Sequence, residues 1–271
     1  MRRSPFHRKN ATLRVAAANG EAEVVLYDEI GFWGVTAEDF KKQIDDIKAK
    51  TIHLRINSPG GDVFDGLAIH NALREHDAKV VTHIDGVAAS MASVVAMAGD
   101  EILMADNAFM MLHEPWSLAM GNAEALRKEA DLLEKVSGSL HSVYEARTGA
   151  DAEQVSTWMT DETWLTAAEA KTAGFVDEIT TGEEGKARDI AATFDLSVFN
   201  HLPDELQEDE EREPTIRDLE RALRDAGLSQ IAAKQYISAG REAATHRDGE
   251  EAGERDVTPG SVKSFKPTFV T

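Results

Sequence analysis

Hydrophobic residues in the first two thirds of the chain alternate between strand-like and helix-like spacing. Strands are predicted for the short β-rich or alternating runs "AEVVLYD" (22–28), "TIHLRIN" (51–57), "KVVTHIDG", "EILMAD", "AFMMLH" and "FVDEIT". Helices are predicted at 37–50, 63–76, directly after Ser90, at 122–148, near 151–159 and at 166–173. Thr36 suits the N-cap of the first helix, and Ser137-Gly138 is expected to weaken the long one. This succession predicts an α/β fold with parallel strands joined by right-handed crossovers.

The composition changes after residue 182 and suggests how the chain is divided. Residues 183–213 are charged and are expected to form an acidic linker. Residues 214–242 predict a pair of short helices, with Gly227 suiting the end of the first and Ser229 the start of the second. The predicted division is a basic N-terminal arm (1–19), an α/β domain (20–182), the linker (183–213), the helical pair (214–242) and a disordered tail (243–271).

The formal net charge of −20 narrows the range of partners. It disfavours binding to nucleic acids or anionic membranes, which are themselves polyanions, although "MRRSPFHRK" (1–9) is basic. The absence of cysteine excludes disulfides, cysteine nucleophiles and thiolate metal sites. No apolar run approaches the roughly 18 residues of a membrane span. The sequence therefore predicts a soluble, cytoplasmic protein with no nucleic-acid or membrane partner.

Two chain reversals follow predicted strands and carry candidate chemistry. Ser90 stands between "VVTHIDG" and an apolar helix, where it is either a helix cap, a buried serine bonded to backbone, or an exposed nucleophile. Ser93, one turn later, is expected to bond the preceding turn's carbonyl. "NSPGGD" (57–62) is a turn whose Gly60 and Gly61 could bring N–H groups to the same edge, because the carboxyl ends of parallel strands cluster.

A hydroxyl nucleophile needs a base that takes its proton and an acid that orients this base. The sequence offers candidates for both. His113 ends the strand "AFMMLH", where it is either structural or a general base. Asp161 and Glu162 stand before Trp164, where acids also favour the start of a helix. Glu114 makes no metal site with His113, because no second histidine follows at helical spacing.

Four segments together resemble one family in order and spacing. These are "INSPGGDVFDGLAIHNAL", "GVAASMAS", "MLHEP" and "WLTAAEAKTAGFVDEI". They are similar to the ClpP serine peptidases, and more narrowly to the ClpP-related phage head-maturation (prohead) proteases, over about residues 20–180. The resemblance implies the ClpP/crotonase-like spiral of ββα units and a homo-oligomeric ring. The helical pair resembles the C-terminal extension of the phage branch.

The resemblance also implies roles for individual residues. Ser90 corresponds to the nucleophile and His113 to the base, while the backbone N–H groups of Gly61 and Met91 correspond to the oxyanion donors. The third position departs from the family, which has aspartate two residues before the aromatic. Glu162 occupies that position here, and adjacent Asp161 is the alternative acid. No cofactor and no metal are implied.

The sequence thus predicts a serine endopeptidase that matures phage heads by cleaving scaffold and capsid proteins, in the host cytoplasm or the procapsid. One alternative is a ClpP-type housekeeping peptidase that works with an ATPase unfoldase. A second alternative is a catalytically inactive scaffold or assembly subunit. An acyl-CoA enzyme of the crotonase type would share the fold but would not need both Ser90 and His113.

Overall fold

The computed structural model describes residues 13–18, 20–181, 194, 196, 198–203 and 206. The first twelve residues, most of the predicted linker, the predicted helical pair and the predicted tail lie outside the described residues. The chain divides into two compact units, Met1–Asp209 and Glu210–Thr271, and every described residue belongs to the first. The domain boundaries expected from the sequence stay a prediction.

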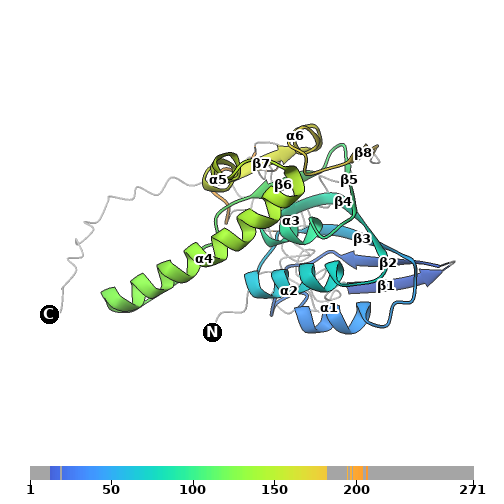
Figure 1. Ribbon diagram of the computed structural model, residues 1–271, viewed down its shortest axis with the longest axis horizontal. Coiled ribbons are helices and arrows are strands. Elements are labelled where there is room, and N and C mark those ends of the chain that lie inside the picture. Colours follow the sequence, from blue (N-terminus) through green and yellow to red (C-terminus); the bar gives the residue numbers. More distant parts are fainter. Residues whose placement is uncertain are drawn as a thin grey trace, which may run out of the picture. The chain divides into compact units, whose positions relative to one another are not determined.

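An eight-stranded sheet organises the first unit (Figure 1). Its strands are β1 (Leu13–Ala18), β2 (Glu21–Leu26), β3 (Thr51–Ser58), β4 (Lys79–Ala89), β5 (Glu101–Ala105), β6 (Phe109–Leu112), β7 (Thr163–Thr166) and β8 (Glu178–Thr180). The order is β1-β2-β3-β4-β5-β8, and β6 pairs with both β4 and β7. All pairs are parallel except β1–β2 and β6–β7. The predicted α/β class is confirmed.

Strand β4 has a different neighbour along each half. Residues 81–84 pair with β5, whereas Val87, Ala88 and Ala89 pair with β6. The end of β4 therefore leaves β5 and lies beside β6, which in turn carries β7. This second part of the sheet brings the residues that follow β4 and β6 to one edge.

Six helices accompany the strands in the residues that the structure describes. They are α1 (Ala37–Ile44), α2 (Val63–Arg74), α3 (Met91–Ala96), α4 (Ala123–Thr148), α5 (Ala152–Thr160) and α6 (Ala167–Thr172). Figure 1 shows α1, α2 and α3 together on one face of the sheet, and α4 extending away from it. Thr36 caps α1 as predicted, since its side chain accepts a hydrogen bond from the Asp39 N–H. No helix in the described ranges is long and apolar enough to cross a membrane.

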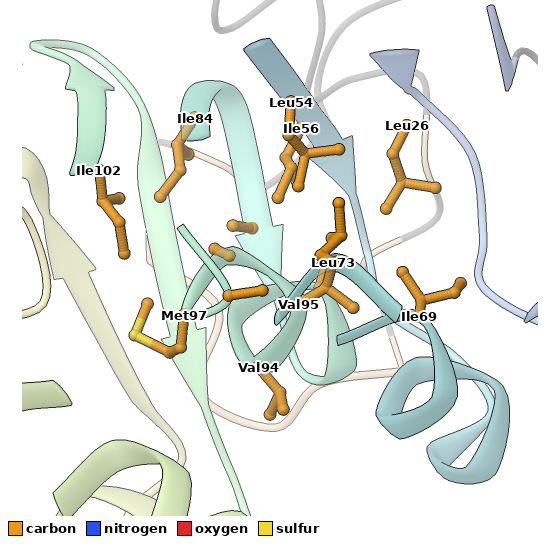
Figure 2. Packing of buried hydrophobic residues seen from close by; sticks show 14 of the residues in the cluster. Leu26, Leu54, Ile56, Ile69, Leu73, Ile84, Val94, Val95, Met97 and Ile102 are labelled. Carbon is orange, nitrogen blue, oxygen red and sulfur yellow. The ribbon is translucent and has the colours of Figure 1, made fainter. Parts of the chain in front are cut away.

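The main core lies between the sheet and the helices α1, α2 and α3. Leu54 and Ile56 of β3 and Ile84 of β4 point toward Leu73 of α2 and Val95 of α3 (Figure 2). Each of these five side chains is at most 1% exposed. Burial of one such side chain is worth about 1.5–3 kcal/mol relative to exposure, so this layer fixes the strand ends that carry the candidate site.

Several elements differ from the sequence-based expectations. Strand β1, which pairs antiparallel with β2, falls within the predicted N-terminal arm, and β7 was not predicted. Helix α1 ends at Ile44, with Asp45 as its C-cap, and is shorter than predicted. Helix α4 runs without interruption through Gly138, where an added Cβ would meet nothing within 4 Å.

Candidate active site

Ser90 lies at a sharp reversal between β4 and α3. Its backbone adopts φ 52° and ψ −128°, a conformation that residues other than glycine rarely adopt. The preceding strand pairs with β6, and the Ser90 N–H donates to the Met111 carbonyl oxygen at 3.0 Å. Helix α3 begins at the next residue and is entirely buried. The packed strand and helix on either side hold this unfavourable conformation in place.

The Ser90 hydroxyl is not used to cap the helix. Ser90 is the N-cap residue of α3, yet its side chain makes no capping hydrogen bond. Its Oγ instead lies 2.8 Å from Nε2 of His113, which follows β6. The Ser93 hydroxyl donates to the Ser90 carbonyl oxygen at 2.6 Å, which confirms the expectation for Ser93. The structure thus brings the predicted nucleophile and base into hydrogen-bond contact, while their catalytic roles stay a prediction.

Burial sets the protonation of His113. It lowers the pKa of the imidazole from its ordinary value near 6.5, and the nearby carboxylates of Glu162 and Glu114 oppose this shift in part. The neutral ring, which is the form able to accept a proton from Ser90, therefore persists at lower pH than in an ordinary histidine.

We expect kcat/KM for peptide cleavage to fall on the acid side with a midpoint below about 6.5, the unperturbed pKa of histidine. Protonation of His113 removes the general base, and its lowered pKa moves that protonation to more acidic pH. The pH dependence of kcat/KM measures this midpoint directly, with Ser90→Ala giving the background hydrolysis. A midpoint above 7 would contradict this assignment.

The glycine turn lies against the reversal at Ser90. A Cβ added to Gly60 would be 2.7 Å from Ser90 Cβ and 2.8 Å from the Met91 nitrogen. The N–H of Gly61 belongs to the peptide that joins it to Gly60, so it lies in the same place. Among the described residues, no acceptor is bonded to the N–H of Gly61 or of Met91. Two free donors on the chain segments that meet at Ser90 suit a developing oxyanion, and this role stays a prediction.

Gly60→Ala is expected to lower both stability and activity. Besides the contacts with Ser90 and Met91, the new Cβ would be 2.6 Å from the Ala89 carbonyl oxygen, at a φ of +92°. The strain should cost about 1–3 kcal/mol of unfolding free energy. Displacement of Ser90 should lower kcat/KM by about 10-fold or more.

Gly138→Ala is the matched control, because this residue of α4 has open space around it and no positive φ. It is expected to raise stability by about 0.5–1 kcal/mol and to leave kcat/KM unchanged. Thermal or urea unfolding and peptide hydrolysis measure both variants. A Gly60→Ala protein as stable and active as the wild type would show that the turn is not packed against Ser90.

The two candidate acids are placed differently. Glu162 is buried, with 8% exposure, adopts φ +50°, and its charge acts on His113. Asp161 is exposed and is the C-cap residue of α5. Within the described residues, Glu162 has no hydrogen bond to His113. Its two oxygens are bonded to Asn200 and His201 instead, so the assignment of the acid stays a prediction that this placement favours for Glu162.

Residues beyond the predicted domain contact this site, although the sequence did not predict it. Phe199 packs against the rings of His113 and Trp164, with centroids 5.7 and 5.6 Å away. Leu196 is buried, and Phe194 packs on a small cluster on β4 and β6. These residues lie in the predicted acidic linker but pack on the domain. The missed signal is a group of large apolar residues within the charged stretch, namely Phe194, Leu196, Val198, Phe199 and Leu202.

A second polar group includes Glu114, the residue after His113. The carboxylate of Glu114 accepts hydrogen bonds from the Ser137 hydroxyl and bonds Nε2 of His141 at 3.1 Å. In the described residues, no three side chains of histidine, aspartate or glutamate are grouped so that they could hold a metal ion. The chemistry available at this edge is that of a hydroxyl, an imidazole, carboxylates and backbone N–H groups.

The part of the chain that carries this site is similar to known proteins. Residues 20–183 match the Clp protease family. The chain is 30% identical to the ATP-dependent Clp protease proteolytic subunit of Bacteroides fragilis (strain ATCC 25285) over 166 residues, 57% of this chain and 80% of the relative. A protein of that name from Oltmannsiellopsis viridis is 32% identical over 136 residues, 49% of this chain and 70% of the relative.

Proposed function

Because the chain belongs to the Clp protease family, we propose that it is a serine endopeptidase that cleaves scaffold and capsid proteins during phage head maturation. The peptidase part rests above all on the 2.8 Å contact between Ser90 Oγ and His113 Nε2. The phage part rests on the resemblance of the motifs to prohead proteases. A C-terminal region lies beyond the matched residues 20–183, and the phage branch also carries such an extension.

The proposed reaction follows from the placement of these groups. Ser90 attacks the scissile carbonyl while His113 takes the hydroxyl proton and then gives it to the leaving amine. The N–H groups of Gly61 and Met91 stabilise the oxyanion, each contributing about 3 kcal/mol to the transition state. The resulting acyl-enzyme is hydrolysed by water, which His113 activates in the same way. Glu162 is the proposed acid that orients the imidazole.

We also propose a homo-oligomeric ring. Helix α4 extends away from the sheet in Figure 1 and carries exposed Leu126 and Leu132, and the segment before it exposes Leu118 and Met120. Large apolar side chains grouped in this way favour contact with another protein surface. A second copy of the chain is the proposed partner, and sedimentation velocity would measure the assembly.

Co-expression with scaffold and capsid proteins tests the proposed substrates. Mass spectrometry should find new internal termini in these proteins with the wild-type chain and none with Ser90→Ala. Absence of cleavage by an active wild-type enzyme would contradict the phage assignment.

The names of the relatives support a second candidate, because they are proteolytic subunits of ATP-dependent proteases. That candidate is a housekeeping peptidase that receives its substrates from an ATPase. Cleavage of folded substrates only when an unfoldase and ATP are added would favour it over the phage assignment.

A further inference from the structure

The candidate active site receives contacts from a segment outside the region shared with the family. The match ends at residue 183, whereas Phe199, Asn200 and His201 lie against the proposed base and acid. We propose that Phe199, Asn200 and His201 complete the active site, with Phe199 positioning His113 and the N–H of His201 positioning Glu162. This inference rests on the proposed peptidase function.

The carboxylate of Glu162 has two donors from this segment. The backbone N–H of His201 donates to Oε1 at 2.7 Å, and the side-chain amide of Asn200 donates to Oε2 at 3.2 Å. A buried carboxylate needs such donors, because burial removes the water that would otherwise solvate it. Glutamate also has one more rotatable bond than the aspartate of the family pattern. The two hydrogen bonds therefore restrict a side chain that has more conformational freedom than an aspartate would have.

The ring of Phe199 contacts His113, the proposed base. It meets the His113 ring edge-to-face, at an interplanar angle of 85°, and the Trp164 ring at 77°. It also packs on the small cluster formed by Val87, Ala89 and Met111, all 0% exposed. The imidazole is thereby held from the side, which restricts its rotation and keeps Nε2 directed at Ser90.

The contacts of the segment indicate whether it supports the active site or blocks the entry of substrate. Phe199, Asn200 and His201 contact the imidazole ring and the carboxylate of Glu162. Within the described residues, no hydrogen bond or ring contact joins these three residues to Ser90 or to the N–H groups of Gly61 and Met91. A segment that blocked substrate would cover the hydroxyl and the oxyanion donors. The contacts of Phe199, Asn200 and His201 are instead with the imidazole of His113 and the carboxylate of Glu162.

His201→Pro tests the backbone donor, because proline lacks the N–H. Misplacement of the acid is expected to lower kcat about 10- to 100-fold with little change in KM. His201→Ala keeps the N–H and removes only the ring, which bonds the Asp161 carbonyl oxygen through Nδ1, so its loss should be much smaller. Asn200→Ala, at an exposed position, should lower kcat without affecting folding. Val198→Ala, 55% exposed, is the control expected to match the wild type.

Two further measurements separate positioning from a general structural effect. In a Glu162→Gln background, His201→Pro should cause no additional loss, because it acts through that carboxylate. Phe199→Ala should move the acid midpoint of kcat/KM to higher pH by hydrating His113, while Glu162 and Glu114 still face the ring. Phe199→Leu should restore much of the wild-type profile.

The outcomes separate this inference from the proposed function. Wild-type activity in both His201→Pro and Asn200→Ala would overturn the inference, and increased activity would show that the segment obstructs the site. An equal loss from His201→Pro in the wild-type and Glu162→Gln backgrounds would also overturn it. If a fluorophosphonate fails to label Ser90 in the wild-type chain, the peptidase proposal itself fails. Thermal unfolding of each variant identifies any loss caused by misfolding.

Discussion

Ser90→Ala should lower kcat/KM for peptide cleavage by at least about 10³-fold, or about 4 kcal/mol of transition-state stabilisation. The substitution removes the atom that attacks the carbonyl but leaves the imidazole and the two backbone N–H groups in place. The backbone at residue 90 is already held at φ 52° by β4 and α3, and alanine retains the same Cβ. In the described part of the chain, the only hydrogen-bond partner of the hydroxyl is His113. The fold should therefore be unaffected.

The measurement is paired with fluorophosphonate labelling, since only an activated serine reacts. Labelling should be lost in Ser90→Ala and retained in Ser142→Ala, which removes an exposed hydroxyl of α4 bonded to the Gly138 carbonyl oxygen. Equal unfolding temperatures for the three proteins would exclude a folding defect. Wild-type cleavage by Ser90→Ala would show that this chain is not a serine peptidase acting through residue 90, and would favour an inactive assembly subunit.

The pairing of Ser90 with His113 was implied by the family resemblance, and the ends of the strands that precede them supply its physical reason. Parallel strands end on one edge of a sheet, and residues 87–89 do pair with β6, just before His113. The sequence could not indicate that the end of β4 leaves β5 for β6, because this depends on how the strands twist past one another. It also left open whether Ser90 caps α3. The observed φ and the direction of the hydroxyl decide that question in favour of the contact with His113.

The segment after β8 was less predictable for a different reason. Its charged surroundings resemble a linker, and single residues such as Phe199 have no periodicity from which a partner could be inferred. What places them is an uncovered apolar surface on β4, β6 and β7, which exists only once the sheet has formed. Strand β1 was missed in the same way, because its pairing with β2 rather than its own pattern defines it.

The charge at position 162 has a specific use in the proposed mechanism. When His113 accepts the proton from Ser90, the imidazole becomes positive in a largely buried site, which burial disfavours. The charge of a nearby carboxylate stabilises that imidazolium electrostatically. Glu162 is buried and acts electrostatically on His113, whereas Asp161 is exposed at the end of α5. The two adjacent acids therefore predict very different effects of substitution.

Glu162→Gln should lower kcat by about 10²- to 10⁴-fold, because the amide has nearly the same shape but no charge to stabilise the imidazolium. The acid midpoint of kcat/KM should also fall, since the carboxylate raises the pKa of His113 in the wild type. Asp161→Asn, the matched control, should leave both quantities close to wild type. Steady-state kinetics over the acid limb, on variants shown to unfold at wild-type temperature, measures this. The reverse pattern, a large loss in Asp161→Asn and little in Glu162→Gln, would transfer the orienting role to Asp161 and would require the loop before β7 to rearrange when substrate binds.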